Sequence, residues 1–259
     1  MTDVIELFSG LDEIKVRGGH EWFRFSNHDV RTDEATVEIY DELGHFGITA
    51  ADFTAALDAL PKSTKTINLR INSPGGSVFD GLTIANRLRE HKATVNVTVD
   101  GVAASIASVI AMAGDHVTMA RGSQMMIHNP SGLVMGGSAD MRAMADLLDK
   151  VARDTIADAY MAKAGGAVDE WLARMAEETW FSGPEAVAVG LADVAESQDE
   201  GADEPDEPAN QSKAFDLTAY GFRHPGRDAA PDPQAADRAR RSAQIRARHD
   251  ARRQEARGK

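Results

Sequence analysis

The chain has 259 residues, enough for one sizeable domain with appendages, and its 42% hydrophobic and 27% charged residues are typical of a globular protein. A formal net charge of −13 argues against specific nucleic-acid binding over most of its length, because phosphate contacts need clustered lysine and arginine. The chain contains no cysteine, which excludes disulfides, thiolate metal sites and a cysteine nucleophile, and the sequence suggests no cofactor and no metal.

Alternating apolar patterns predict strands and helices that follow one another along the chain. Predicted strands cover residues 22–25, 35–40, 66–71, 95–99, 116–119 and 124–127. Predicted helices cover residues 49–60, a segment after Ser77, and residues 103–113, 138 to about 164, 168–175 and a segment that opens at Ser182. Strand–helix alternation of this kind favours an α/β fold with a largely parallel sheet.

Side chains at the ends of these segments sharpen the prediction. Thr49, Ser77 and Ser182 have the residue type that caps a helix N-terminus. The helix after Ser77 should bury a face made of four apolar side chains. These are Val78, Leu82, Ala85 and Leu88.

The composition divides the chain into four parts. Residues 1–34 are poorly patterned and should be partly ordered, and residues 35–195 form the globular domain. Residues 196–235 are an acidic, proline-containing linker, which should be disordered and solvated. Residues 236–259 are rich in arginine and almost lack apolar positions, so they form a basic tail compatible with an exposed helix but not with a core.

The N-terminal residues and the hydropathy of the chain indicate where in the cell the protein is expected. The chain begins with acidic rather than basic residues, unlike a secretory signal. The most apolar run, residues 102–114, is shorter than the ~20 residues that span a bilayer. We therefore expect a cytoplasmic protein without a membrane partner.

Two reactive side chains lie where buried segments end. Ser105 follows a predicted strand at the start of a run of small residues, and His128 follows the strand at 124–127. A serine and a histidine in such positions indicate a nucleophile and its base, with backbone N–H groups of a helix start available for an oxyanion. Gly75 and Gly76, at another strand-to-helix junction, allow close approach of a substrate to the backbone.

Each signal alone also has an ordinary structural interpretation. A serine in a run of alanine and glycine often belongs to a tightly packed helix, and a histidine in an apolar run is often a hydrogen-bonded core residue. The sequence Ser-Pro-Gly-Gly at 73–76 is often a turn. The order and spacing of the signals therefore carry more information than any one of them.

Together they resemble a known family. The resemblance covers roughly residues 35–195 and rests on the segments 71–78 (INSPGGSV), 101–105 (GVAAS), 126–130 (MIHNP), 178–186 (ETWFSGPEA) and 190–193 (GLAD). These segments are similar to the Clp protease proteolytic subunit family, and more closely to its phage and prophage branch, the head-maturation (prohead) proteases.

The resemblance implies a crotonase-like fold of stacked β-β-α units, assembled into a homo-oligomeric ring. It implies that Ser105 is the nucleophile, that His128 is the general base, and that the backbone N–H groups of Gly76 and Ile106 form the oxyanion hole. The loop after His128 and the start of the following long helix would line an extended-substrate groove and a contact between rings.

The chain departs from the family pattern at two places. The aspartate of the family's catalytic triad aligns with Glu178, which can orient an imidazole with one more methylene of reach, and Glu177 and Asp158 are alternatives. The segment that forms the axial pore and part of the ATPase docking surface in housekeeping Clp subunits has no match in residues 1–34, which makes an unfoldase partner doubtful.

The sequence thus predicts an ATP-independent serine endopeptidase that cleaves capsid or scaffold proteins, and possible self-cleavage, in the host cytoplasm or an assembling prohead. Its acidic linker and basic tail offer sites for self-cleavage or capsid contact. Three alternatives remain: a housekeeping-type subunit that works with an ATPase unfoldase, a crotonase-like acyl-CoA enzyme, and a non-catalytic capsid assembly scaffold.

Overall fold

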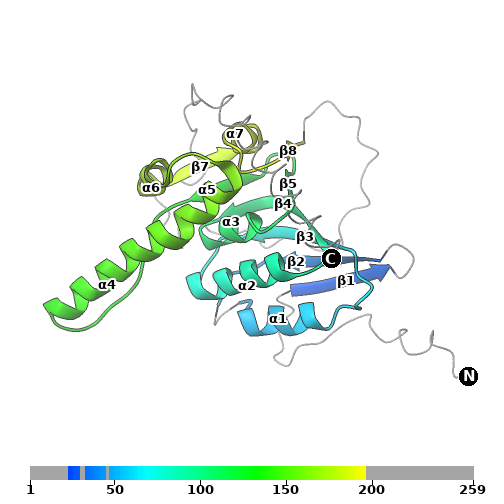
Figure 1. The fold of residues 1–259 in the computed structure, drawn as a ribbon, viewed down its shortest axis with the longest axis horizontal. Coiled ribbons are helices and arrows are strands. Elements are labelled where there is room, and N and C mark those ends of the chain that lie inside the picture. Colours follow the sequence, from blue (N-terminus) through cyan, green and yellow to red (C-terminus); the bar gives the residue numbers. More distant parts are fainter. Residues whose placement is uncertain (1–22, 30–32, 45–46, 197–259) are drawn as a thin grey trace, which may run out of the picture. The chain divides into compact units, whose positions relative to one another are not determined.

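The computed structural model describes residues 23–29, 33–44 and 47–196, which belong to two compact units (Figure 1). The first unit ends at Val117, and the second begins at Thr118. Most of the predicted N-terminal segment, the acidic linker and the basic tail lie outside the described residues.

The first unit contains a sheet whose strands confirm the predicted parallel arrangement. Strand β1 (Phe23–Asp29) pairs antiparallel with β2 (Glu34–Ile39), and β2, β3 (Thr66–Ser73) and β4 (Thr94–Ala104) run parallel. Apolar side chains on alternate positions of β2, β3 and β4 are buried, as a period of two requires for a half-covered sheet. The helices of this unit pack against one face of the sheet (Figure 1).

The described part of this unit contains three helices, and the first two begin at the predicted N-caps. They are α1 (Ala50–Asp58), α2 (Val78–Glu90) and α3 (Ile106–Ala111). The Thr49 hydroxyl accepts from the N–H of Asp52 at 3.2 Å, and the Ser77 hydroxyl accepts from the N–H of Asp80 at 3.4 Å. Each cap satisfies one N–H group that the first turn of a helix leaves without a partner.

The buried face of α2 differs from the predicted one. Val78 and Leu82 are only half-buried, whereas Gly81 and Ile84 are buried together with the predicted Ala85 and Leu88. The cause is close packing on α3, since a Cβ at Gly81 would lie 2.4 Å from Cγ1 of Ile106. The helix is therefore rotated so that its smallest residue meets the neighbouring helix.

The run of small residues at 103–113 is only partly helical, which corrects the prediction. Ala103 and Ala104 continue β4, and α3 begins at Ile106. Ala103 pairs with Ser73 of β3, so the strand ladder holds the start of the run in an extended conformation. Pairing with a neighbouring strand thus overrides the helical propensity of alanine.

The second unit contains two pairs of strands. Strand β6 (Gln124–Ile127) pairs antiparallel with β7 (Thr179–Ser182), a strand that the sequence pattern did not predict. The end of β5 (His116–Met119) pairs in parallel with β8 (Val194–Ala195). Helices α6 (Val168–Ala176) and α7 (Gly183–Val189) complete the part of this unit near β7.

A long helical rod also belongs to the second unit (Figure 1). It consists of α4 (Ser138–Val151), a π-helical turn η1 (Ala152–Ala157) and α5 (Asp158–Ala164), so the predicted helix is confirmed but contains one wider turn. No residue of α4 is buried in the single chain, and Met141 and Leu147 are exposed. In the part of the chain that the structure describes, no helix has the length and hydropathy needed to cross a bilayer.

Candidate catalytic site

Ser105 lies at a sharp turn between strand β4 and helix α3. Its backbone has φ 55° and ψ −129°, a conformation that residues with a Cβ rarely adopt. Among the described residues other than glycine, positive φ occurs at Asp33, Ser105 and Glu178, so two of the three are predicted catalytic residues. Strained backbone of this kind concentrates at functional sites, where the surrounding structure holds it in place.

The glycine pair of the 71–78 segment packs directly against this turn. A Cβ at Gly75 would lie 2.8 Å from Cβ of Ser105 and 3.1 Å from the backbone nitrogen of Ile106. Gly75 has φ 92° and Gly76 has φ 139°, which are accessible to glycine but strained for other residues. The sequence predicts that these glycines let a substrate approach the backbone closely; the group that approaches Gly75 in the structure is Ser105.

Leu43 holds the glycine pair from its other side. The N–H of Leu43 donates to the carbonyl of Gly75 at 2.7 Å, and the N–H of Ser77 donates to the carbonyl of Leu43 at 2.8 Å. A Cβ at Gly76 would lie 2.1 Å from the Leu43 carbonyl oxygen. A larger residue at position 76 would therefore displace the loop.

Ser73, which the sequence reasoning did not single out, orders the same loop. Its side chain is fully buried, donates to the carbonyl of Asp41 at 2.6 Å and accepts from the N–H of Gly75 at 3.1 Å. The N–H of Gly75 is thus occupied. The N–H groups of Gly76 and Ile106 donate to no other group among the described residues, and Ile106 opens α3, where an N–H has no intrahelical partner.

His128 and Glu178 lie at equivalent positions of two paired strands in the second unit. The ladder between β6 and β7 runs from Gln124 opposite Ser182 to Ile127 opposite Thr179. His128 directly follows the last paired residue of β6, and Glu178 directly precedes the first paired residue of β7. Glu178 itself has a φ of 53° and therefore departs from the extended strand conformation.

One carbonyl group fixes the ends of both strands. The N–H of Asn129 and the N–H of Glu178 both donate to the Met175 carbonyl of α6, each at 3.2 Å. The Thr179 hydroxyl donates to the Arg174 carbonyl at 2.7 Å. The end of α6 therefore holds the backbone on either side of the His128–Glu178 pair.

Burial separates Glu178 from the other two acids that the sequence offered. The Glu178 residue is 4% exposed, and its Oε1 accepts from the indole N–H of Trp180 at 3.4 Å. Glu177 and Asp158 are both exposed. A buried carboxylate within reach of a histidine can orient its imidazole, whereas exposed acids are usually solvated.

The structure thus assembles the predicted site residues in two groups. In the first unit, Gly76 follows Gly75, which packs on Ser105 and Ile106, and in the second unit His128 and Glu178 directly flank the ladder of β6 and β7. Within each group the sequence alone gave the residues but not their contacts. The sequence did not predict strand β7, whose partner β6 lies more than fifty residues earlier in the chain.

Comparison with known proteins tests the resemblance. The family model for Clp protease matches residues 32–198. This chain belongs to the Clp protease family. Members of the family are serine endopeptidases, so the predicted enzyme class is confirmed, as is the predicted α/β fold of a Clp protease domain.

Individual relatives agree with this assignment. The ATP-dependent Clp protease proteolytic subunit of Leuconostoc citreum (strain KM20) is 38% identical over 135 residues, which cover 50% of this chain and 66% of the relative. The subunits with the same name from Streptococcus gordonii (strain Challis) and Streptococcus pneumoniae (strain Hungary19A-6) are each 36% identical over 162 residues, covering 61% of this chain and 80% of the relative.

Proposed function

We propose that this chain is a serine endopeptidase that forms its acyl-enzyme at Ser105. The observation that carries the proposal is the strained Ser105 turn packed against Gly75 in a chain of the Clp protease family. A serine hydroxyl becomes nucleophilic when a base removes its proton while fixed donors stabilise the oxyanion. The first unit supplies the hydroxyl and two unengaged N–H groups for these roles.

In the proposed reaction, Oγ of Ser105 attacks the carbonyl carbon of the scissile peptide while His128 accepts the hydroxyl proton. The N–H groups of Gly76 and Ile106 donate to the oxyanion of the tetrahedral intermediate. When the C–N bond breaks, His128 gives the proton to the leaving amine. Water then attacks the ester with His128 again as the base, which releases the carboxylic acid and restores Ser105.

Glu178 acts through His128 in this proposal. Its carboxylate fixes the orientation of the imidazole and stabilises the imidazolium that forms when the proton is transferred. The register of β6 and β7 and the burial of Glu178 support this role over the alternatives Glu177 and Asp158.

Reaction with a fluorophosphonate probe tests the nucleophile. The wild-type protein should be labelled at Ser105, and Ser105→Ala should lose labelling and cleavage of casein while its thermal unfolding stays unchanged. Ser123→Ala, which removes the hydroxyl of a buried serine elsewhere in the chain, is the control and should label like the wild type. Undiminished casein cleavage by Ser105→Ala would refute the assignment.

The same experiment addresses two of the alternative functions. A non-catalytic capsid scaffold would not react with the probe at all. A crotonase-like acyl-CoA enzyme would bind CoA thioesters and would not need Ser105 for turnover. Labelling at Ser105 without measurable binding of acetyl-CoA therefore favours the endopeptidase.

We further propose that the enzyme works without an ATPase, as a phage-type capsid maturation protease that assembles into a ring in the host cytoplasm or the prohead. The motifs around Ser105 and His128 and the acidic and basic C-terminal segments support this interpretation. The relatives carry the name "ATP-dependent", which favours a second candidate, a proteolytic subunit that works with an unfoldase.

Cleavage of the chain by itself distinguishes the two candidates. A maturation protease should cut its own C-terminal region, or unstructured casein, in the absence of nucleotide, and mass spectrometry should locate the cut sites. Ser105→Ala is the control. Protein that stays intact and leaves casein uncut, yet still reacts with the fluorophosphonate probe, would favour the ATPase-dependent candidate.

A further inference from the structure

The ladder between β3 and β4 changes register shortly before Ser105. Ile71 lies opposite Val99, but the next pair is Ser73 opposite Ala103. One residue of β3, Asn72, therefore faces three residues of β4. The excess of two residues makes a bulge, a feature that bends strands and re-aims side chains next to active sites.

This bulge determines which residue lies beside the glycine pair. If the register after it is continued, Gly75 comes opposite Ser105, in agreement with the 2.8 Å between Cβ of Ser105 and a Cβ built on Gly75. In the register before the bulge, Gly75 would face Ala103 instead. Ser105 would then lie two residues further along the strand, which is about 6.6 Å.

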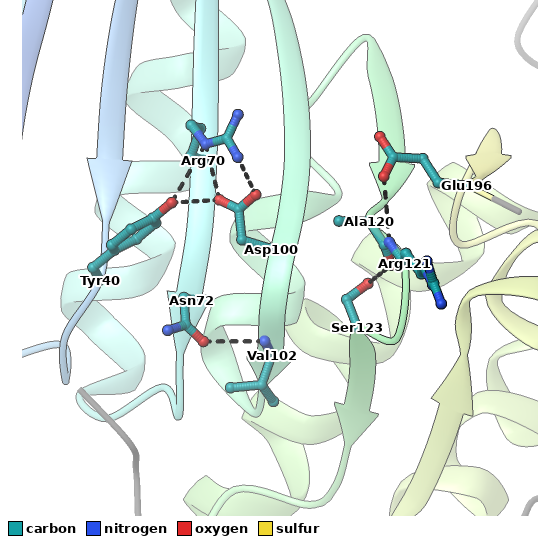
Figure 2. Close-up of polar contacts among 9 residues, drawn as sticks. All are labelled: Tyr40, Arg70, Asn72, Asp100, Val102, Ala120, Arg121, Ser123 and Glu196. Atoms are coloured by element: carbon teal, nitrogen blue, oxygen red, sulfur yellow. Dashed lines mark hydrogen bonds and ion pairs between the residues drawn. The ribbon is translucent and has the colours of Figure 1, made fainter. Parts of the chain in front are cut away.

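A buried side chain closes the bulge at its end (Figure 2). The Asn72 residue is 8% exposed, and its Oδ1 accepts from the N–H of Val102 at 3.2 Å. Within the irregular stretch between the pairs Ile71–Val99 and Ser73–Ala103, this N–H therefore has a side-chain acceptor on the neighbouring strand. An unsatisfied buried N–H would cost free energy, so the contact favours the shifted register.

A second group of side chains holds the beginning of the bulge (Figure 2). The Arg70 guanidinium binds both carboxylate oxygens of Asp100, and the Tyr40 hydroxyl donates to Oδ2 of the same carboxylate at 2.6 Å. Burial and this hydrogen bond raise the pKa of Tyr40 to about 12, so the hydroxyl keeps its proton and donates this hydrogen bond at neutral pH.

Gly101 shows how closely the Asn72 amide is fitted. A Cβ at Gly101 would lie 2.6 Å from Oδ1 of Asn72, a distance that real side chains do not show. The φ of Gly101 is outside the left-handed region, so the backbone itself accepts alanine there. An alanine at position 101 would therefore displace the Asn72 amide, although the backbone conformation itself accepts it.

We propose that Asn72 is a positioning residue, which holds the β4 bulge and thereby places Ser105 against the oxyanion donor of Gly76. The inference rests on the proposed function, since it assigns the bulge a role in the reaction of Ser105. Nucleophile and oxyanion donor lie on the ends of two different strands, so their relative position depends on the register of these strands. A displacement of about 1 Å in such a constellation costs about 100-fold in rate.

Substitutions at positions 72 and 101 test this role through the kinetics of fluorophosphonate labelling. Asn72→Ala should lower the maximal rate of labelling at least tenfold and change the probe's half-saturating concentration less than twofold, because the probe's contacts remain. Asn72→Asp keeps an acceptor oxygen and should recover most of the rate. Gly101→Ala should lower the rate like Asn72→Ala, since its methyl group displaces the amide.

A double variant and a matched control make the test specific. Asn72→Ala with Gly101→Ala should be no slower than either single variant, because both remove the same hydrogen bond. Asn96→Ala removes another side-chain hydrogen bond of β4, from Asn96 to Asn68 at 3.3 Å, and should label at the wild-type rate. All variants should show a single cooperative thermal transition.

Amide hydrogen exchange distinguishes a failure of the proposed function of Ser105 from a failure of the positioning role of Asn72. Asn72→Ala should accelerate exchange in the peptide that contains Val102, whatever the activity. If wild-type Ser105 does not label although this exchange accelerates, the proposed function fails and the structural role of Asn72 stands. If the wild type labels and Asn72→Ala labels equally fast, or if the two substitutions act additively, the positioning role is refuted.

Discussion

Replacement of Glu178 by glutamine separates a catalytic from a structural role of this buried acid. The amide has the same shape as the carboxylate and still offers an oxygen to the indole N–H of Trp180, which is 3.4 Å from Oε1. A hydrogen bond of this kind contributes about 1 kcal/mol to stability, so the variant should lose no more than that. For a domain of this size, the Tm should fall by at most about 4 °C.

The expected effect on catalysis is far larger. The amide carries no charge to stabilise the imidazolium of His128 and favours the wrong tautomer of the ring. The corresponding replacement in a Ser-His-Asp triad lowers kcat by about 10⁴, which corresponds to about 5.5 kcal/mol at 1.36 kcal/mol per factor of ten. We therefore expect Glu178→Gln to lose at least about 10³ in kcat/KM for a fluorogenic peptide substrate.

Glu178→Asp provides the conservative comparison. Aspartate keeps the charge and tolerates the φ of 53° at this position better than glutamate does, but its carboxylate lies one methylene, about 1.5 Å, further from the opposite strand. Its activity should lie between the wild type and the amide. Glu177→Gln and Asp158→Asn, which change exposed acids, should keep wild-type activity.

The reasoning is refuted if the folded Glu178→Gln protein keeps more than a tenth of the wild-type kcat/KM. The same holds if Glu177→Gln or Asp158→Asn abolishes activity instead. Circular dichroism on each variant confirms that loss of activity is not loss of fold.

Three further substitutions are predicted from local geometry. Lys163→Met removes the ammonium group 3.1 Å from the largely buried carboxylate of Asp193 and should cost about 3 kcal/mol, or about 6–12 °C in Tm. The pKa of His91 is lowered mainly by burial. The neutral imidazole therefore contributes fully to the free energy of unfolding above the unfolded pKa of about 6.5, and this contribution is lost as the pH falls through the lower folded pKa. His91→Gln should remove this part of the pH dependence of stability. Gly75→Ala combines a φ of 92° with a methyl group 2.8 Å from Ser105 Cβ and should lower fluorophosphonate labelling at least tenfold.

Each of these predictions has a measurement and a contradicting result. Thermal unfolding of Lys163→Met in the Ser105→Ala background should show the loss, and a Tm within 2 °C of the parent would contradict it. The free energy of unfolding of the wild type and of His91→Gln should be measured with urea between pH 5 and 8. If it changes with pH in the same way for both proteins, His91 makes no contribution and the prediction is contradicted. Labelling of Gly75→Ala at the wild-type rate would show that the close contact is not needed for the reactivity of Ser105.

Much of the fold follows from local patterns. The parallel strands around Val37, Leu69 and Val97 alternate apolar and polar residues, and Thr49 and Ser77 cap the helices that they precede. These features depend on residues a few positions apart, so the sequence predicts them directly. The exceptions are instructive, because the strand pairing of Ala103 and the packing of Gly81 on α3 involve residues far away in the sequence.

The predicted catalytic site also has some features that the sequence determined and others that it did not. The sequence by itself determined the residue types and their order, Gly76 before Ser105 and His128 before Glu178, and this order carried the resemblance to the Clp protease family. Their local contexts also showed that the serine and the histidine end buried segments. The resemblance selected Glu178 over its neighbour Glu177, but no local pattern showed that Glu178 is buried and Glu177 exposed.

Only the tertiary structure decided which residues meet within each unit. The ladder of β6 and β7 ends directly beside His128 and Glu178, and the bulge in β4 brings Ser105 against Gly75. Register is set by pairing between strands as distant in sequence as β6 and β7, where Gln124 pairs with Ser182. A slip of one residue turns every side chain to the other face. Local sequence contains no measure of that pairing, so the contacts of the site come from the folded chain alone.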